Sequence, residues 1–296
     1  MRKISKRAQE ENRAGWLFMT PAMIIFVILV AVPVVVSLLL SFTKWNFLSG
    51  LSGIEWVGMK NFTQIFTADR KFKMALVNTL IYALTVTPIS IILALLFAYM
   101  INDKTHLRKF NRLCFFIPYI SSMVALAAVF RFLFRSDGPI NLLLTQVFHL
   151  SAVPKWLTDT SLCRIPVICV MIYAGIGFSL IVYMAALQSV PKELYEAATM
   201  DGAASFRKFV SITLPMLSPT TFYLCIVRLI AAFKAFSAIN IMGVSTSAPS
   251  LVTEIYGNAF NSYKFGYASA EAWVLVAVIL TVTVFQFWGQ KKWVHY

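Results

Sequence analysis

Three basic side chains fall inside the most apolar stretches of the sequence, where a charged group needs a specific reason to be present. They are Arg131, Arg228 and Lys234. At bilayer depth an ionisable residue costs at least about 2.5 kcal/mol, so a functional role is the default interpretation. Arg131 lies near the end of its stretch and can extend its charge to the interface. We expect at least one of Arg228 and Lys234 to face a polar cavity or a partner subunit.

The longest polar-rich segment of the chain runs from Glu193 to Pro215 and separates two strongly apolar stretches. Pro191, just before it, suits the first turn of a helix. Glu193 and Glu196 follow, where the positive end of a helix dipole favours carboxylates. The segment therefore predicts a short helix with an acidic N-terminal end.

One side of this predicted helix offers a contact surface. Ala197, Ala198 and Asp201 share that side at helical spacing, and their small side chains let another backbone approach closely. Gly202 then ends or bends the helix, and Pro215 marks the turn into the next apolar stretch. We expect either a helix that docks onto a partner or an amphipathic surface helix without one.

No arrangement typical of catalysis or metal binding occurs in the sequence. There is no G-x-x-x-x-G-K-[ST] phosphate loop, and the four cysteines and three histidines lack metal-ligand spacing. No Asp or Glu lies in the interior of an apolar stretch, where proton-coupled carriers usually need one. We expect a non-catalytic chain without a metal or cofactor of its own, driven by energy from another protein.

The composition is that of a membrane protein. Hydrophobic residues make up 59% of the 296 residues and charged residues only 13%, whereas a soluble domain has about 45–50% and about 25%. The net charge of +14 alone would also suit nucleic acid. Because the basic residues stand between apolar runs, we expect contact with membrane lipid and not with nucleic acid.

Six stretches are long and apolar enough for helices that cross a hydrocarbon core of about 30 Å. They span residues of about 17–42, 75–101, 113–134, 165–187, 217–239 and 271–289. The first is too long for the apolar part of a signal peptide and is interpreted as a retained span. We therefore predict an all-α membrane protein in which residues 1–296 form a single transmembrane domain.

The distribution of Lys and Arg predicts the orientation. With the N-terminus inside, the four inner segments hold 14 Lys and Arg in 63 residues, and the three outer ones hold 9 in 93. We expect both termini in the cytoplasm, together with the loop of residues 188–216. The basic cluster at 70–73 is then left outside and is the weakest point of this topology.

The stretch "EAATMDGAASFRKFVSITLP" resembles the EAA motif of prokaryotic ABC importer permeases. That motif, E-A-A, three residues, G, nine residues, then I-x-L-P, is met at every spacing from Glu196 to Pro215. The flanking "SVPKELYEAATMDGA", the N-terminal "WLFMTPAMIIFVILVAVPVVVSLLLSFTKW" with "WVGMKNFTQIF", and the last apolar stretch are similar to the first permease type of the maltose, multiple-sugar and glycerol-phosphate importers. The likeness covers nearly the whole chain. One departure is "GVSTSAPS" at 243–250, where the family often has Gly-Gly-Pro.

The resemblance implies a type I ABC importer permease fold in the prokaryotic cytoplasmic membrane, with a coupling helix between spans four and five. It implies a second, non-identical permease subunit, two ATPase subunits that bind ATP and Mg, and an extracytoplasmic solute-binding protein that delivers a sugar. The implied coupling residues are Glu193, Glu196, Ala197, Ala198, Asp201, Gly202 and Pro215.

Sugar sites combine rings for stacking with polar groups that bond hydroxyls, and spans four and five contain both. The candidate pathway residues are Tyr173, Gly175, Phe178, Lys234, Phe236 and Asn240. The resemblance implies that these spans contribute to the substrate site. Packing of the same residues against the second permease is the alternative.

Three functions are therefore compared. The first is a permease subunit for an oligosaccharide. The second is a permease for a phosphorylated polyol such as a glycerol phosphate, which Arg228 and Lys234 would favour. The third, a six-span channel or enzyme, is disfavoured by the intact EAA spacing and by the lack of catalytic groups.

Overall fold

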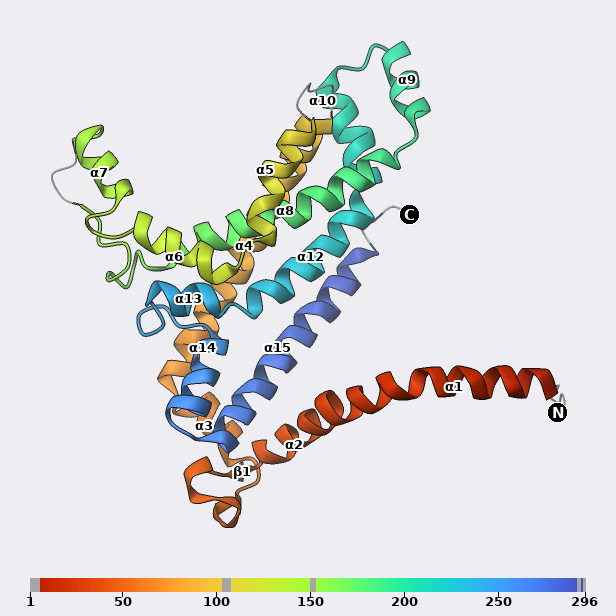
Figure 1. Cartoon of the computed structure of the whole chain (residues 1–296). Helices are drawn as coiled ribbons and strands as arrows, with labels where there is room; N and C mark the ends of the chain where they lie inside the picture. Colours follow the sequence, from red (N-terminus) through yellow and green to blue (C-terminus); the bar gives the residue numbers. More distant parts are fainter. Residues whose placement is uncertain (1–5, 103–107, 150–152, 292–293, 295–296) are drawn as a thin grey trace. The chain divides into compact units, whose positions relative to one another are not determined.

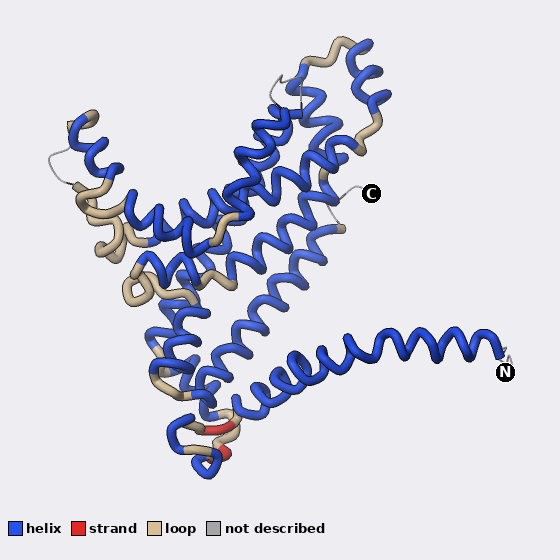
Figure 2. Tube along the Cα trace, viewed as in Figure 1, coloured by secondary structure: helices blue, strands red, loops and turns tan. Residues whose placement is uncertain are grey.

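The computed structural model describes residues 6–102, 108–149, 153–291 and 294, and most of them are helical (Figures 1 and 2). Two compact units are distinguished: Met1–Ala68 with Ile255–Val274, and Asp69–Glu254 with Leu275–Tyr296. In the described part of the chain, four helices are long and apolar enough to cross a membrane, or up to six spans if each of two bent helix pairs counts as one. The chain is a multi-pass membrane protein.

The first unit begins with a long apolar helical segment. Helix α1 (Lys6–Phe26) continues through a π-helical turn (Val27–Ala31) into α2 (Val32–Ser41). The N–H of Val32 bonds to the carbonyl of Val27, and Pro33 has no N–H to donate. The wider turn therefore stands where a regular α-helix would lose a hydrogen bond.

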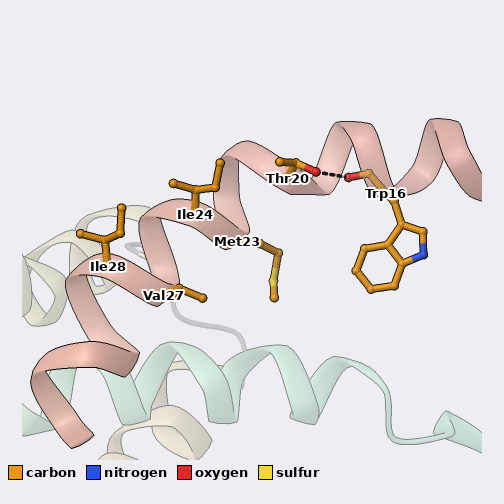
Figure 3. Close-up of a pocket in the computed structure, with 6 residues that line it drawn as sticks. All are labelled: Trp16, Thr20, Met23, Ile24, Val27 and Ile28. Atoms are coloured by element: carbon orange, nitrogen blue, oxygen red, sulfur yellow. Dashed lines mark hydrogen bonds between the residues drawn. The ribbon is translucent and has the colours of Figure 1, made fainter. Parts of the chain in front are cut away.

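One face of α1 carries only large apolar groups and a threonine whose hydroxyl bonds back to its own helix. The face is lined by Trp16, Thr20, Met23, Ile24, Val27 and Ile28, which border a hollow of about 410 Å³ (Figure 3). Thr20 donates to the carbonyl of Trp16 at 2.7 Å, so its hydroxyl presents no free donor. Such a face suits lipid or another membrane helix.

A short strand pair follows α2, which the sequence analysis did not predict. Strands β1 (Thr43–Lys44) and β2 (Glu55–Trp56) pair antiparallel, with two 3-10 turns (Phe47–Ser49, Leu51–Gly53) between them. Asn61, in α3 (Lys60–Thr67), donates from Nδ2 to the carbonyls of Ser41 and Thr43 at 2.8 and 2.9 Å. The amide of one buried side chain thus fixes the end of α2 against α3.

The second unit is built around α4 (Arg70–Asn102) and α8 (Arg164–Gln188), which pack along each other. Their interface combines small residues on α4, such as Ala94 and Ala98, with Leu180 and Tyr183 on α8, and all four are fully buried. Small side chains allow the two backbones to approach closely, as in other membrane helix pairs. Helix α12 (Ser218–Phe233) packs against α4 beside them.

Two of the expected spans are broken in the structure. The expected span 113–134 consists of α5 (Arg108–Ile120) and α6 (Met123–Leu133), which meet at 103°. The expected span 217–239 ends earlier, because α12 stops at Phe233 and a separate helix, α13 (Ser237–Met242), follows. Only two or three residues separate the apolar helices at each break, so hydropathy averaged over a whole span did not reveal them.

The remaining described helices are α7 (Pro139–Gln146), α9 (Lys192–Met200), α10 (Ser205–Lys208), a π-helical turn (Phe209–Thr213), α11 (Leu214–Met216), α14 (Leu251–Tyr256), a π-helical turn (Gly257–Asn261) and α15 (Phe265–Gln290). Where the carbonyl of Thr43 approaches α15, a Cβ on Gly266 would collide with it.

Candidate functional site

The loop of residues 188–216 extends beyond the end of α8, and α9 lies at its outermost part (Figure 1). Pro191 occupies the N-cap position with φ −58° and ψ 130°, and Glu193 lies in the first turn. No residue of α9 is buried. The loop thus presents a helix whose side chains are exposed, except for the half-buried Tyr195 and Ala198.

The backbone at the end of α9 requires glycine. Gly202 has φ +73°, in the left-handed region that side-chain-bearing residues avoid. Its N–H bonds to the carbonyl of Thr199 at 3.0 Å, and the N–H of Ala203 bonds to the carbonyl of Ala198 at 2.9 Å. A Cβ at Gly202 would meet nothing within 4 Å. The restriction at this position therefore comes from the backbone angle and not from crowding inside the chain.

A hollow of about 480 Å³ lies beside the end of α9. It is lined by Ala198, Asp201, Gly202, Ala203, Ala204, Arg207, Lys208, Ser211 and Ile212. Three predicted coupling residues thus share one surface depression with two basic side chains. Glu193, Glu196 and Ala197 lie on α9, exposed, and do not line this hollow.

One contact joins α9 to the π-helical turn within the loop, and a second joins that turn to α4. The hydroxyl groups of Tyr195 and Thr213 lie 2.9 Å apart, and the Thr213 side chain is fully buried. The ring of Phe209 meets that of Tyr99 edge to face at 4.7 Å. A displacement of α9 therefore reaches the π-helical turn and α4 through specific side chains.

Pro215 lies where the loop turns into α12. The helical segment Ser205–Met216 meets Ser218–Phe233 at 65°. The hydroxyl of Ser218 donates to the carbonyl of Pro215 at 2.6 Å, and Leu217 between them is buried in the core. The bend is thus held by a local hydrogen bond and by one buried leucine.

A second site lies within the helices of the second unit, around Arg228. A cavity of about 210 Å³ is lined by Val86, Pro118, Tyr119, Ser121, Met123, Met171, Ala174, Arg228, Ala231 and Ala232. Ser121 stands in the break between α5 and α6. The polar groups at the cavity come from Arg228, Tyr119 and Ser121.

Gly175 explains how the arginine fits against α8. A Cβ on Gly175 would collide with the guanidinium of Arg228. Among the described residues, Nε of Arg228 is buried without a hydrogen-bond partner. Arg131, by contrast, donates from Nη1 to the carbonyl of Ile241 at 3.0 Å and so caps the end of α13.

The six predicted pathway residues do not form one cluster. Gly175 lies beneath Arg228, and Phe178 packs on Tyr119 with ring centroids 5.4 Å apart. Tyr173 packs on Phe130 at 5.6 Å. The other three lie elsewhere: Lys234 is the exposed C-cap of α12, Phe236 precedes α13, and Asn240 is exposed on α13.

Residues 65–294 match a protein family described as "Binding-protein-dependent transport system inner membrane component". The chain belongs to this family. Members are the permease subunits of ABC importers, which are non-catalytic membrane components. Because the chain belongs to this family of non-catalytic subunits, the alternative that it is an enzyme is excluded.

Curated relatives match the permease over almost its full length. The probable ABC transporter permease protein YesP of Bacillus subtilis is 32% identical, over 99% of this chain and 96% of the relative. The lactose transport system permease protein LacF of Rhizobium radiobacter is 30% identical, over 97% and 96%. These matches confirm the resemblance to permeases of carbohydrate ABC importers.

The permease also matches solved structures. A bacterial ABC transporter that imports the acidic polysaccharide alginate has a chain with a TM-score of 0.81 and 26% identity, over 97% of this chain and 99% of that chain. A second structure, with a TM-score of 0.80, contains that transporter with an alginate pentasaccharide-bound periplasmic protein. The fold is that of a type I ABC importer permease.

Several side chains at the two sites escaped the sequence analysis. Tyr119 and Ser121 enter the cavity only because the helix breaks beside them, and no sequence feature was used to find that break. Arg207 and Lys208 line the hollow beside α9. Both are basic and follow the glycine of the motif closely, and this was the sequence feature that could have indicated them.

Proposed function

We propose that the permease forms half of the translocation pathway of an ATP-driven sugar importer and is coupled to an ATPase through the 188–216 loop. The observation that carries this proposal is a helix without a buried residue, α9, followed by a left-handed glycine and a hollow of about 480 Å³. This geometry occurs within a segment that satisfies the EAA spacing. A partner protein would pack against the exposed side chains of α9.

The contact would combine charge with close approach. Glu193, Glu196 and Asp201 offer three carboxylates, while Ala197 and Ala198 add little bulk. The hollow beside them accepts a side chain from the ATPase surface. ATP and Mg would be bound by the two ATPase subunits, because this chain has no phosphate loop.

The loop would act as a lever on the membrane helices. Closure of the ATPase pair moves α9, and the Tyr195–Thr213 contact carries the movement to the segment before Pro215. The bend held by Ser218 then passes it to α12. Rigid displacement of such a packed element alternates access between the two sides of the membrane.

The substrate proposed for this pathway is an oligosaccharide. The relatives that transport lactose and alginate support a glycan of more than one ring. A phosphorylated polyol is a second candidate, because Arg228 places a cation at a cavity inside the helices. In both cases an extracytoplasmic binding protein would deliver the solute, and it would do most of the selecting.

Within this proposal the 296 residues form one transmembrane domain of six spans in the prokaryotic cytoplasmic membrane, paired with a second permease. Both termini and the 188–216 loop are cytoplasmic. Ser205, exposed at the start of α10, gives a test of that orientation. A Ser205→Cys variant on a cysteine-free background should resist an impermeant thiol reagent in intact cells and react after lysis. Labelling before lysis would reverse the orientation.

Co-expression with candidate ATPase subunits tests the coupling. We expect the pure permease to show no ATP hydrolysis, and the complex to hydrolyse ATP faster when loaded binding protein is added. ATP turnover by the permease alone, or failure of every P-loop partner encoded beside it to co-purify, would defeat the proposal.

A further inference from the structure

Arg228 is a cation within an apolar helix, and the described residues form no salt bridge with it. It is the eleventh residue of the sixteen in α12, far from either end. None of the six apolar stretches has an Asp or Glu in its interior; Glu271 stands at the edge of the last one. The phenol of Tyr119 lines the same cavity as the guanidinium. Buried cations are stable when an anion or several acceptors pair with them. Among the described residues, none accepts a hydrogen bond from the buried Nε of Arg228.

The surroundings of Arg228 are built to keep the guanidinium accessible from one side. Gly175 lets the planar group lie directly against α8, because any larger side chain there would collide with it. The opposite side opens to the cavity of about 210 Å³. Met123, Met171 and three alanines make most of the remaining wall apolar. An apolar wall lowers the local dielectric and strengthens the attraction of an anion.

The break between α5 and α6 supports a ligand at this place. Non-helical backbone at membrane depth is tolerated where it lines a cavity or is covered by protein. Ser121, in the break, lines this cavity with Tyr119 from the preceding helix. The Tyr119 hydroxyl can donate to a neutral oxygen of a solute. The Ser121 hydroxyl donates to the carbonyl of Ile117 at 2.8 Å, so its oxygen can only accept from a solute hydroxyl. The arginine would bind a charged group. Half-helices that end at a binding site are common in transporters.

We propose that Arg228 binds an anionic group, a carboxylate or a phosphate, on the sugar that crosses the membrane. This inference rests on the proposed importer function and adds the charge of its substrate. The arginine fork matches the planar oxygens of a carboxylate and two oxygens of a phosphate, whereas a neutral hydroxyl uses only part of it. The cavity is smaller than the roughly 300–1,000 Å³ of whole-ligand pockets, so it receives one group of the solute.

The test compares charged and neutral probes on the purified complex of both permeases and the ATPase, without binding protein. The probes are α-1,4-digalacturonate with its neutral counterpart α-1,4-galactobiose, and sn-glycerol 3-phosphate with glycerol. We expect one anionic probe to bind more tightly than its neutral counterpart. In Arg228→Gln that preference should fall about tenfold or more, because a charge-assisted pair is lost. Which anionic probe binds distinguishes a uronate from a phosphate substrate.

Two further variants keep the test independent of folding. Arg228→Lys retains the charge without the fork and should keep part of the preference, and Arg228→Met preserves length without charge and should resemble Arg228→Gln. Lys155→Gln, which removes an exposed charge outside the cavity, should leave binding unchanged. Monodispersity of each complex shows whether it is intact.

Three results would overturn the inference. One is a wild-type complex that prefers neither anionic probe, and another is an unchanged preference in Arg228→Gln. The third is loss of the second permease from the purified Arg228→Met complex, which would assign the arginine to an ion pair between subunits. ATP hydrolysis is measured in the same samples. If it is present without any anion preference, only this inference fails, whereas its absence from every complex defeats the importer function itself.

Discussion

The 188–216 loop and the segment of residues 243–250 are both connections within the second unit, yet they satisfy their polar groups in opposite ways. In the 243–250 segment, the carbonyls of Ala248 and Pro249 accept hydrogen bonds from Tyr82 and Asn78 of α4, and Ser250 is fully buried. In the 188–216 loop, α9 has no buried residue.

The 243–250 segment is packed and hydrogen-bonded by other parts of the same chain, whereas α9 in the 188–216 loop is not covered by them. Buried backbone groups must be paired, and α4 supplies the partners for the 243–250 segment. Its sequence departs from the family's Gly-Gly-Pro, and side chains of α4 hold the turn that results. The 188–216 loop leaves small residues and carboxylates in the open. Substitutions in the first connection should therefore change stability, and those in the second should change coupling.

Gly202→Leu should have the largest effect on coupling. The left-handed backbone costs an ordinary residue about 1–2 kcal/mol, and added bulk at a close contact costs about 1–3 kcal/mol more. We expect the variant to insert and to pair with the second permease normally. Recovery of the ATPase in a pull-down from detergent should fall about tenfold or more.

Gly243 provides the matched control, because it has φ +75° beside the 243–250 segment. A Cβ there would lie 3.8 Å from Nη2 of Arg131, an ordinary contact. Gly243→Leu therefore introduces the same backbone strain at a different place and should leave ATPase recovery intact. Equal loss in both variants would mean that strain, and not the contact surface, explains the result.

The helical membrane class could be predicted from the sequence because apolar length and composition suffice for it. The breaks could not. Ser121 and Ser122 interrupt an apolar run without a glycine, and the apolar run resumes directly after the 103° bend between α5 and α6. The strand pair at Thr43 and Trp56 was equally hidden, since two-residue strands have no usable periodicity.

The candidate sites divide in the same manner. The residues around Gly202 could be found because the EAA spacing is local in sequence. The cavity could not, because it joins Val86, Tyr119, Met171 and Arg228 from four different helices. The sequence marked Arg228 as an unusual charge but counted Lys234, and not Arg228, among the pathway residues. The structure puts Lys234 at the exposed end of α12. Contacts between distant helices carry no signature in a single sequence.

Asn78→Leu should produce the largest loss of stability. The variant leaves the carbonyl of Pro249 and Nε of Arg164 without the partners they have at 3.0 and 2.8 Å. Each buried unsatisfied group costs about 1–3 kcal/mol. We expect a thermal midpoint in detergent that is lower by several degrees, with ATPase recovery unchanged relative to the amount of folded protein. Thr158→Ala, at an exposed site, is the control. A midpoint equal to wild type would show that α4 does not hold this segment.

Lys234→Met should have a moderate effect on transport. The ammonium is exposed at the C-cap of α12, where a cation stabilises the helix end by about 0.3–1 kcal/mol. We expect the complex to assemble and the initial rate of sugar uptake into proteoliposomes to fall about two- to fivefold. Uptake at the wild-type rate and apparent affinity would instead assign Lys234 to packing or to a subunit contact.

The smallest effect is expected from removing one hydroxyl in each region, in a matched pair of tyrosines. Tyr195 contacts Thr213 in the loop, and Tyr183 bonds Thr221 in the core, both at 2.9 Å. A hydrogen bond of this kind contributes about 0.5–1.5 kcal/mol. Tyr195→Phe should lower the stimulation of ATP hydrolysis by loaded binding protein about twofold, with the thermal midpoint nearly unchanged.

Tyr183→Phe should do the reverse, because Tyr183 is fully buried on α8 and its hydroxyl bonds Thr221 of α12 and not a residue of α9. Its thermal midpoint should fall while stimulation per folded complex stays at the wild-type level. The two variants delete the same atom from the same residue type at the same hydrogen-bond length. Any difference between the effects of the two variants therefore comes from where each tyrosine lies and not from the atom that is removed. If both variants lower only the midpoint, the Tyr195–Thr213 contact merely stabilises the loop, and the remaining side-chain contact for a movement of the π-helical turn is that of Phe209 with Tyr99 on α4.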